Sequence, residues 1–368
     1  MLAGETAPDE TRPAAMIDVR AASDQDRPQV LQLIEQVFGD AEAQRAERRW
    51  DWQWHEDPRL ERPGYRGVVA AWRGRLIANL SCIPAGLHVR GEPVTAWWGV
   101  DNLMHWGLTR RALREERRRE GAEGPRLSKG LALALLDHPA AGPVQLGKHV
   151  AGKMMAIGTR EGIGFEPVAG SGRWTRRIST VPRLRSVLGR PAGTLAGTLA
   201  DLALPRIPRR TPEAQVLEGP FDARFDRLWE AVRHEHEAIT RRDAAVLQWR
   251  YRRHPDIEYR VLVLESADGV RGYLVFSRFE RAGRCRSKVV DLLARRGDDA
   301  AVEALLAGAL RRMRRLGVER VEHYASGPGL APLLRRFGFR PTAKDYPVMQ
   351  RGLAAAELDV TDGDGDGA

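Results

Sequence analysis

The sequence predicts an α/β protein of two tandem domains, each with a mixed central sheet flanked by helices. Three observations support this prediction: an aromatic motif that occurs twice, a strand pair with a turn after each motif, and a Gly-Phe pair near the end of each copy. Self-similarity over this distance indicates a repeated structural unit. The 368 residues are enough for two domains that each bury a core.

Each copy begins with a helical pattern followed by the aromatic motif. The helical pattern covers residues 26–38 in the first copy and 225–239 in the second, with apolar residues on one face. The motif reads WQWHEDP at 52–58 and WRYRRHP at 249–255. We expect its paired aromatic side chains to pack in the core, Trp52 being equivalent to Trp249 and Trp54 to Tyr251.

Strands follow the motif in both copies. The apolar runs GVVAAW and VLVLE each lead into a turn and a second strand, which predicts a hairpin. Further along, Val-Asp at 100–101 matches Val-Asp at 290–291, and GIGFEP at 162–167 matches RFGFRP at 336–341. Each copy thus reads strand, helix, helix, hairpin, strand, helix, strand, helix, strand, which predicts a mixed sheet with helices on both faces.

The domain boundaries follow from these landmarks. The predicted domains span residues 17–175 and 216–352, joined by a linker at 176–215. Residues 1–16 and the acidic tail 353–368 are predicted to be disordered. The linker contains VLGRPAGTLAGTLADLAL, for which we expect a short apolar helix packed on one domain, with a membrane-surface helix as the alternative.

The composition is that of a globular protein with an excess of positive charge. The net charge of +10 comes mostly from arginine and leaves a nucleic-acid partner open beside a solvated basic surface. The charged stretch 110–124 predicts a solvated loop or a short exposed helix. We expect no transmembrane segment and no signal peptide, and Cys82 and Cys285 do not form a disulfide framework. Together these features predict a cytoplasmic protein.

The element order, the strand–Asp–loop–helix centre and the Gly-Phe ending together resemble the GNAT (GCN5-related N-acetyltransferase) superfamily over residues 17–175 and 216–352. The resemblance implies an acyl-CoA-dependent N-acyltransferase, with acetyl-CoA or another acyl-CoA as co-substrate. The acceptor it implies is a primary amine on a small molecule or peptide.

The family's most specific feature is a loop of the form Q/R-x-x-G-x-G/A, whose backbone N–H groups and following helix hold the pyrophosphate. In the first copy Gly130-x-Ala132 fits, but Leu127 stands where Gln or Arg is expected. In the second copy Asp298 or Asp299 would cap the helix and place a carboxylate at the pyrophosphate position. We therefore assign acyl-CoA binding to the first copy, and its predicted cofactor-binding residues are Leu103, Met104, His105, Arg126, Leu127, Ser128, Lys129, Gly130, Leu131 and Ala132.

Three residues of the first copy are catalytic candidates: Asp101, His105 and His149. A carboxylate or a histidine at the acceptor site can take the proton of the attacking amine. The alternatives are a structural role for Asp101, whose equivalent Asp291 is in the second copy, and simple solvation of the histidines. The family's usual acid, a tyrosine four residues before the Gly of the Gly-Phe ending, is replaced by Arg160 and Leu334.

The oxyanion is expected to bind backbone N–H groups of residues 103–105. Three nearby tryptophans are expected to line an apolar acceptor pocket or simply to be buried: Trp97, Trp98 and Trp106.

Two further functions stay open at this point. Tandem GNAT-like domains also occur in transferases that take an aminoacyl group from charged tRNA, which the basic composition would suit. A non-catalytic GNAT-like binding protein would also fit the absent tyrosine and the imperfect loop. No metal-ligand spacing is present.

Overall fold

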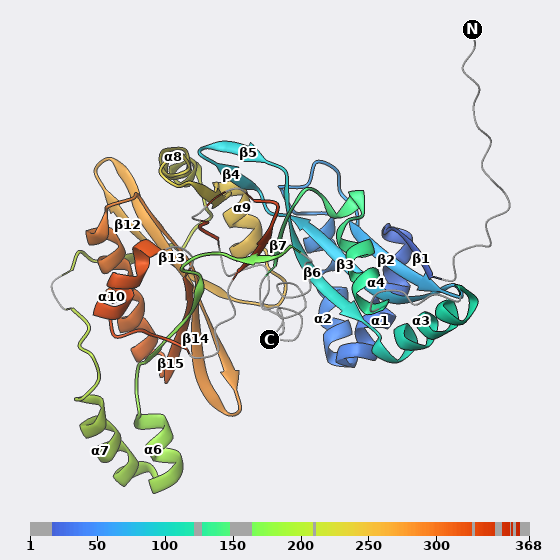
Figure 1. The fold of residues 1–368 in the computed structure, drawn as a ribbon. Coiled ribbons are helices and arrows are strands. Elements are labelled where there is room, and N and C mark those ends of the chain that lie inside the picture. Colours follow the sequence, from blue (N-terminus) through green and yellow to red (C-terminus); the bar gives the residue numbers. More distant parts are fainter. Residues whose placement is uncertain are drawn as a thin grey trace.

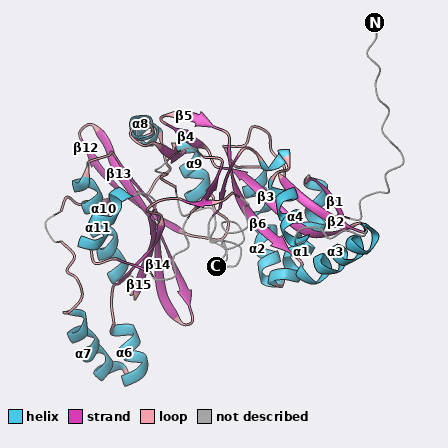
Figure 2. Cartoon of the chain, in the orientation of Figure 1, coloured by secondary structure: helices cyan, strands magenta, loops and turns pink. Residues whose placement is uncertain are grey.

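The computed structural model describes residues 17–120, 127–147, 164–208, 211–325, 328–342, 348–353, 355 and 358–360. Two seven-stranded sheets, each with helices against it, make up most of the molecule (Figures 1 and 2). Residues 1–16, which are predicted to be disordered, lie outside the described part of the chain. Within that part, no helix has the length and apolar character needed to span a membrane.

The first sheet has the strand order β1-β2-β3-β6-β7-β17-β8. Only β6 and β7 run parallel, and the other neighbours are antiparallel. Its strands are β1 (Ile17–Ala21), β2 (Gly67–Trp72), β3 (Arg75–Pro84), β6 (Ala96–Met104), β7 (Val144–Gly147), β17 (Met349–Arg351) and β8 (Glu166–Pro167).

Helices cover both faces of this sheet because its strands are apolar on both sides. Val69 of β2 packs with side chains of the first two helices, whereas the adjacent Val68 and Ala70 pack with those of the next two. The helices are α1 (Arg27–Phe38), α2 (Asp40–Trp54), α3 (Trp106–Glu120) and α4 (Leu127–Leu136). The predicted exposed stretch 110–124 thus belongs largely to α3, whose Ala112 and Leu113 are nevertheless buried.

The second sheet has the order β10-β12-β13-β14-β15-β9-β16, in which only β14 and β15 are parallel. Its strands are β10 (Gln215–Val216), β12 (Tyr259–Ser266), β13 (Gly269–Arg281), β14 (Arg284–Ala294), β15 (Arg320–Ala325), β9 (Gly172–Arg177) and β16 (Arg340–Pro341). The helices against it are α8 (Ala223–Val232), α9 (Ala244–Leu247), α10 (Asp299–Arg315) and α11 (Ala331–Arg336). Position by position, this order agrees with the order of the first sheet.

The two halves exchange one strand. β9, from the end of the first copy, lies between β15 and β16 in the second sheet, and β17, from the end of the second copy, lies between β7 and β8 in the first. A small third sheet also joins the halves, because β11 (Ala238–Thr240) pairs with β4 (Leu87–Val89), which pairs with β5 (Glu92–Val94). Each sheet therefore takes a strand from the other sequence range. The ranges 17–175 and 216–352 stay a prediction of domain boundaries.

The paired aromatic motifs meet at the contact between the halves. The Trp52 and Trp249 rings stack with centroids 4.5 Å apart and planes 12° apart. Each indole N–H donates to the main-chain carbonyl of the other residue, at 3.0 Å from Trp52 and 2.8 Å from Trp249. Trp54 and Tyr251 are buried as well. The expected core role of these four residues is confirmed.

The linker and the tail differ from their predictions. The linker holds two helices, α6 (Val181–Leu188) and α7 (Arg190–Asp201), which pack on each other and stand away from both sheets (Figure 1). The predicted disorder of the tail 353–368 is wrong for Leu353 and for residues 358–360, because Leu353, Leu358 and Val360 are buried and Asp359 pairs with Arg242. Apolar residues that alternate with Asp359 bury this segment, although the acidic composition of the tail predicts disorder.

Candidate functional site

The first candidate site is a fork between the parallel strands β6 and β7. The described pairing joins Ala96–Trp98 to Val144–Leu146, while β6 continues to Met104. Beyond Trp98, β6 carries backbone groups that this described pairing does not use. Figure 1 shows β6 and β7 side by side near the middle of the molecule.

A β-bulge places Asp101 at this fork. The register between β3 and β6 shifts between Asn79 and Ser81, and Asp101 adopts a left-handed φ of 46°. The buried Asn79 amide donates to the Asp101 carbonyl at 3.0 Å, and the Tyr65 hydroxyl donates to Asn79 Oδ1 at 2.7 Å. This buried polar cluster fixes the bulge, since its loss would leave polar atoms unpaired in the core.

The Asp101 carboxyl lies against α2. Burial raises its pKa above the usual value, while Arg49 and a hydrogen bond with Gln53 act in the opposite direction. Nearby Glu42 adds to the increase. A carboxyl with a raised pKa is a better proton acceptor in its ionised form, which suits a general base.

His105 stabilises the start of α3. Its Nδ1 accepts from the Leu108 N–H at 3.2 Å, as a helix cap does. The main-chain N–H of His105 donates to the Ile77 carbonyl at 2.8 Å. The expected oxyanion role is therefore wrong for the His105 N–H. Because successive N–H groups of a strand point to opposite sides, the Met104 N–H is directed toward the fork.

The remaining predicted site residues are either buried in the core or not fully described by the structure. Leu103 and Leu131 are buried in the apolar layers of the first sheet, and Leu127 is the first residue of α4. Arg126 and His149 lie outside the described residues. For five predicted residues the structure describes the helical backbone of α4 but not the side chain: Leu127, Ser128, Lys129, Gly130 and Ala132.

The three tryptophans near Asp101 have different environments. Trp98 is buried in the main core, and Trp97 lies under the Arg66 guanidinium, 5.2 Å from its ring centroid. Trp106 is 51% exposed at the start of α3. Burial, the simpler alternative, holds for Trp98.

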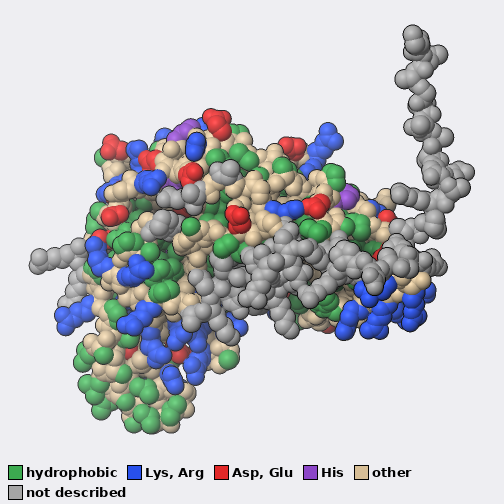
Figure 3. Space-filling model, viewed as in Figure 1, with side chains coloured by type: hydrophobic (Ala, Val, Ile, Leu, Met, Phe, Trp, Pro, Cys, Tyr) green, Lys and Arg blue, Asp and Glu red, His purple; other side chains and the backbone are tan. Residues whose placement is uncertain are grey.

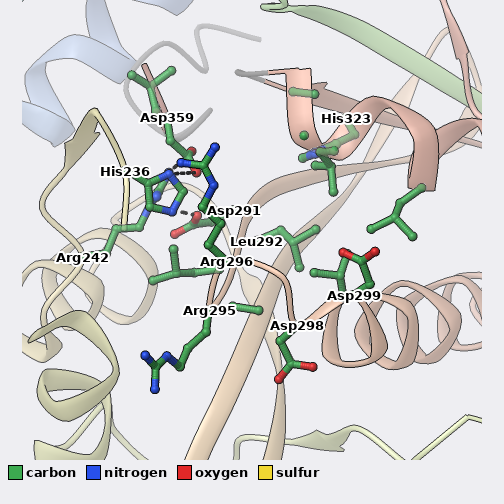
Figure 4. A pocket seen from close by; sticks show the side chains of 18 of the residues that line it. His236, Arg242, Asp291, Leu292, Arg295, Arg296, Asp298, Asp299, His323 and Asp359 are labelled. Carbon is green, nitrogen blue, oxygen red and sulfur yellow. Dashed lines mark hydrogen bonds and ion pairs between the residues drawn. The ribbon is translucent and has the colours of Figure 1, made fainter. Parts of the chain in front are cut away.

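The corresponding fork of the second sheet contains a cavity of about 430 Å³ (Figure 4). β14 and β15 pair over Arg286–Val289 and Arg320–His323 and then separate. The tail residues Leu358–Val360 line this cavity together with Asp291, the equivalent of Asp101. The second fork is thus partly occupied by the chain itself.

A buried ionic cluster holds the tail there. Arg242, 1% exposed, pairs with Asp291 at 3.2 Å and with Asp359 at 2.8 Å. Burial opposes its charge, but Asp359 and Asp291 outweigh this effect and raise its pKa. The Tyr251 and Tyr273 hydroxyls donate to Asp291 at 3.1 and 2.8 Å. Asp291 therefore has a structural environment that differs from that of Asp101.

The start of α10 confirms the expected cap in the second copy. Asp298 accepts from the Ala301 N–H at 3.1 Å, and Arg271 binds the same carboxylate through two nitrogens, the shortest contact being 2.7 Å. A carboxylate fixed at a helix N-terminus occupies the position that favours an anionic ligand. Figure 4 shows Asp298 and Asp299 at one end of the cavity and Arg242 with Asp359 at the other.

Sequence reasoning missed the residues that support both forks. Asn79 lies inside a strand and Arg242 inside an Arg-Arg-Asp run, and neither pattern distinguishes a buried partner from a surface residue. Asp359 was hidden in the acidic tail. Among the described residues, no group of His, Cys, Asp and Glu side chains could hold a metal ion.

Comparisons with known proteins show the fold. No family model and no curated protein matches the sequence. The structure is similar to a GCN5-related N-acetyltransferase from Anabaena variabilis, with a TM-score of 0.57 and 15% identity over 91% of this chain and 72% of that one. It is also similar to Saccharomyces cerevisiae N-myristoyltransferase with bound myristoyl-CoA, with a TM-score of 0.56 and 14% identity over 97% and 85% of the two chains.

A GCN5-related N-acetyltransferase from Kribbella flavida gives a TM-score of 0.51 with 16% identity, over 92% of this chain and 72% of that one. The chain therefore has the GNAT-type α/β fold in a two-sheet arrangement.

Proposed function

We propose that the protein is an acyl-CoA-dependent N-acyltransferase that uses acetyl-CoA and acts on a primary amine. The observation that carries the proposal is the bulge at Asp101, which lies on β6 just beyond its described pairing with β7 and has a carboxyl of raised pKa. The fold likeness to N-acyltransferases gives this geometry its chemical context.

The position of α4 supports acyl-CoA binding in the first half. The carbonyl of Leu136, at the end of α4, accepts from Gln145 of β7 at 2.6 Å and from Arg351 of β17 at 3.3 Å. The end of α4 thus lies beside β7. As a crossover helix between parallel strands, α4 runs back along the sheet, so its start faces the edge where β6 ends.

The first turn of α4 fits a pyrophosphate better than that of α10. It contains no acidic residue and has Lys129 in the sequence, whereas α10 begins at the fixed Asp298 carboxylate. Helix N-termini bind phosphates through free N–H groups and the helix dipole. We therefore propose that the acyl-CoA binds the first half, and Arg126 and Lys129 stay the predicted cations for its pyrophosphate.

In this proposal the acyl-CoA supplies the thioester carbonyl. Asp101 takes the proton that the amine loses as its nitrogen bonds to the thioester carbon. The Met104 N–H donates to the carbonyl oxygen as negative charge develops there. The carbon–sulfur bond then breaks and the departing thiolate takes a proton from solvent, because the chain has Arg160 in place of the family's usual tyrosine.

Thiol release from acetyl-CoA in the presence of a panel of primary amines tests the activity. The Asp101→Asn variant should lose about a hundredfold or more in kcat, as expected for removal of a general base. Glu47→Gln, at an exposed acid of α2, is the matched control and should retain the wild-type rate. Equal rates for wild type and Asp101→Asn would exclude Asp101 as the base.

A further inference from the structure

The helical hairpin of the linker, residues 181–204, exposes an unusual number of large apolar side chains. Five of them are more than half exposed: Val187, Leu188, Leu195, Leu199 and Leu202. They account for most of the large exposed apolar side chains of the described chain. Figure 3 shows many apolar side chains on this hairpin, which projects from the body of the molecule. Patches of this kind mark interaction surfaces.

The outward direction of the leucines is built into the hairpin. α7 packs on α6 through glycines, since a Cβ at Gly193 would lie 2.4 Å from the Leu184 carbonyl oxygen and one at Gly197 would lie 2.5 Å from Val181 Cα. Asp201 closes the hairpin by accepting from the Thr180 N–H at 2.6 Å. Because the small residues make the helix–helix contact, the leucines of α7 are left on the opposite face.

The charge around this apolar surface is positive. Within residues 181–208 all ionisable side chains are arginines except Asp201, which is buried. Four arginines of this range are exposed: Arg183, Arg185, Arg190 and Arg206. At the base of the hairpin the pKa of Arg320 is lowered by burial and by its neighbours Arg286, Arg177 and Arg284. Lys and Arg side chains gather beside the hairpin in Figure 3.

We propose that the linker hairpin docks the protein on the surface of an anionic phospholipid bilayer. The leucines would enter the boundary between headgroups and acyl chains, and the arginines would contact lipid phosphates. A symmetric contact with a second copy would bring the same arginines together, which like charge disfavours. A nucleic acid would leave the leucines in water. The lipid surface is the occupant that satisfies both the apolar and the basic residues.

Sedimentation with vesicles tests this proposal. The full chain should bind vesicles of equal parts phosphatidylcholine and phosphatidylglycerol, and binding to pure phosphatidylcholine should be weaker by about tenfold or more. Leu195→Glu/Leu199→Glu should abolish binding, and Arg183→Glu/Arg190→Glu should remove the preference for the anionic lipid. Both pairs are exposed, so the helical circular-dichroism signal should be unchanged.

Phe38→Glu, at an exposed apolar residue of α1, is the control and should bind like wild type. No binding of wild type to the mixed vesicles would overturn the proposal. Dimerisation in analytical ultracentrifugation that Leu195→Glu/Leu199→Glu removes, without vesicle binding, would also overturn it and identify a second copy as the occupant.

Discussion

The stacked pair Trp52 and Trp249 should contribute directly to the stability of the whole chain. Trp249→Phe keeps a ring in the stack but removes the N–H that donates to the Trp52 carbonyl, and Trp52→Phe does the reverse. Each change removes one buried hydrogen bond and leaves a carbonyl without its donor, which costs about 1–3 kcal/mol. Urea unfolding followed by circular dichroism should show each variant destabilised by this amount.

Because the two rings are in direct contact, the two losses should not add: the double variant should differ from the sum of the single losses by about 0.5–3 kcal/mol. Trp106→Phe, at the 51% exposed tryptophan of α3, is the control and should change the free energy of unfolding by less than about 0.5 kcal/mol. If Trp52→Phe and Trp249→Phe were as mild as this control, the two carbonyls would not depend on the indole donors, and the proposed contact between the copies would be wrong.

Three further predictions concern the buried charges. Arg242→Met should destabilise the protein by about 3–5 kcal/mol in thermal or urea unfolding, because Asp291 and Asp359 lose their buried partner. A loss of stability below about 1 kcal/mol would show that the ion pairs of Arg242 do not hold the tail in place. Asp101 must be ionised to accept a proton, so kcat/KM should fall with decreasing pH through a pKa above that of an ordinary aspartate. A pH profile that is flat across this range would exclude Asp101 as the general base. Since the raised pKa means that the folded state favours the protonated carboxyl, Asp101→Asn should be at least as stable as wild type near neutral pH, as thermal unfolding would show.

Local sequence patterns were sufficient for the repeated elements. The motifs at Trp52 and Trp249 and the hairpins after them have the periodicity of the structures they form. The exchange of β9 and β17 could not be predicted, because a short strand carries no information about which distant sheet it joins. Only tertiary packing decides that choice.

The sequence predicts that Asp101 lies on a strand, but not the local geometry around it. Asp101 was found from its place in the repeat, while its bulge depends on Asn79, which lies on another strand. The sequence suggests His105 as a catalyst because histidines often act as acids or bases near neutral pH, whereas its ring caps α3, a role more typical of Ser, Thr, Asp or Asn. The acidic end of the tail predicts disorder, although Leu358 and Val360 are buried. In each case the role depends on a contact with a residue distant in sequence, or it belongs to a residue type that seldom has that role.

Calorimetric titration with acetyl-CoA tests acyl-CoA binding in the first half most directly. Wild type should bind, Arg126→Glu/Lys129→Glu should lose binding, and Arg260→Glu/Arg281→Glu, an equal charge change on exposed residues of the second sheet, should bind normally. Titration with myristoyl-CoA in parallel compares a longer acyl chain. Absence of binding by wild type to either compound, or unchanged binding by Arg126→Glu/Lys129→Glu, would contradict a cofactor site at the start of α4.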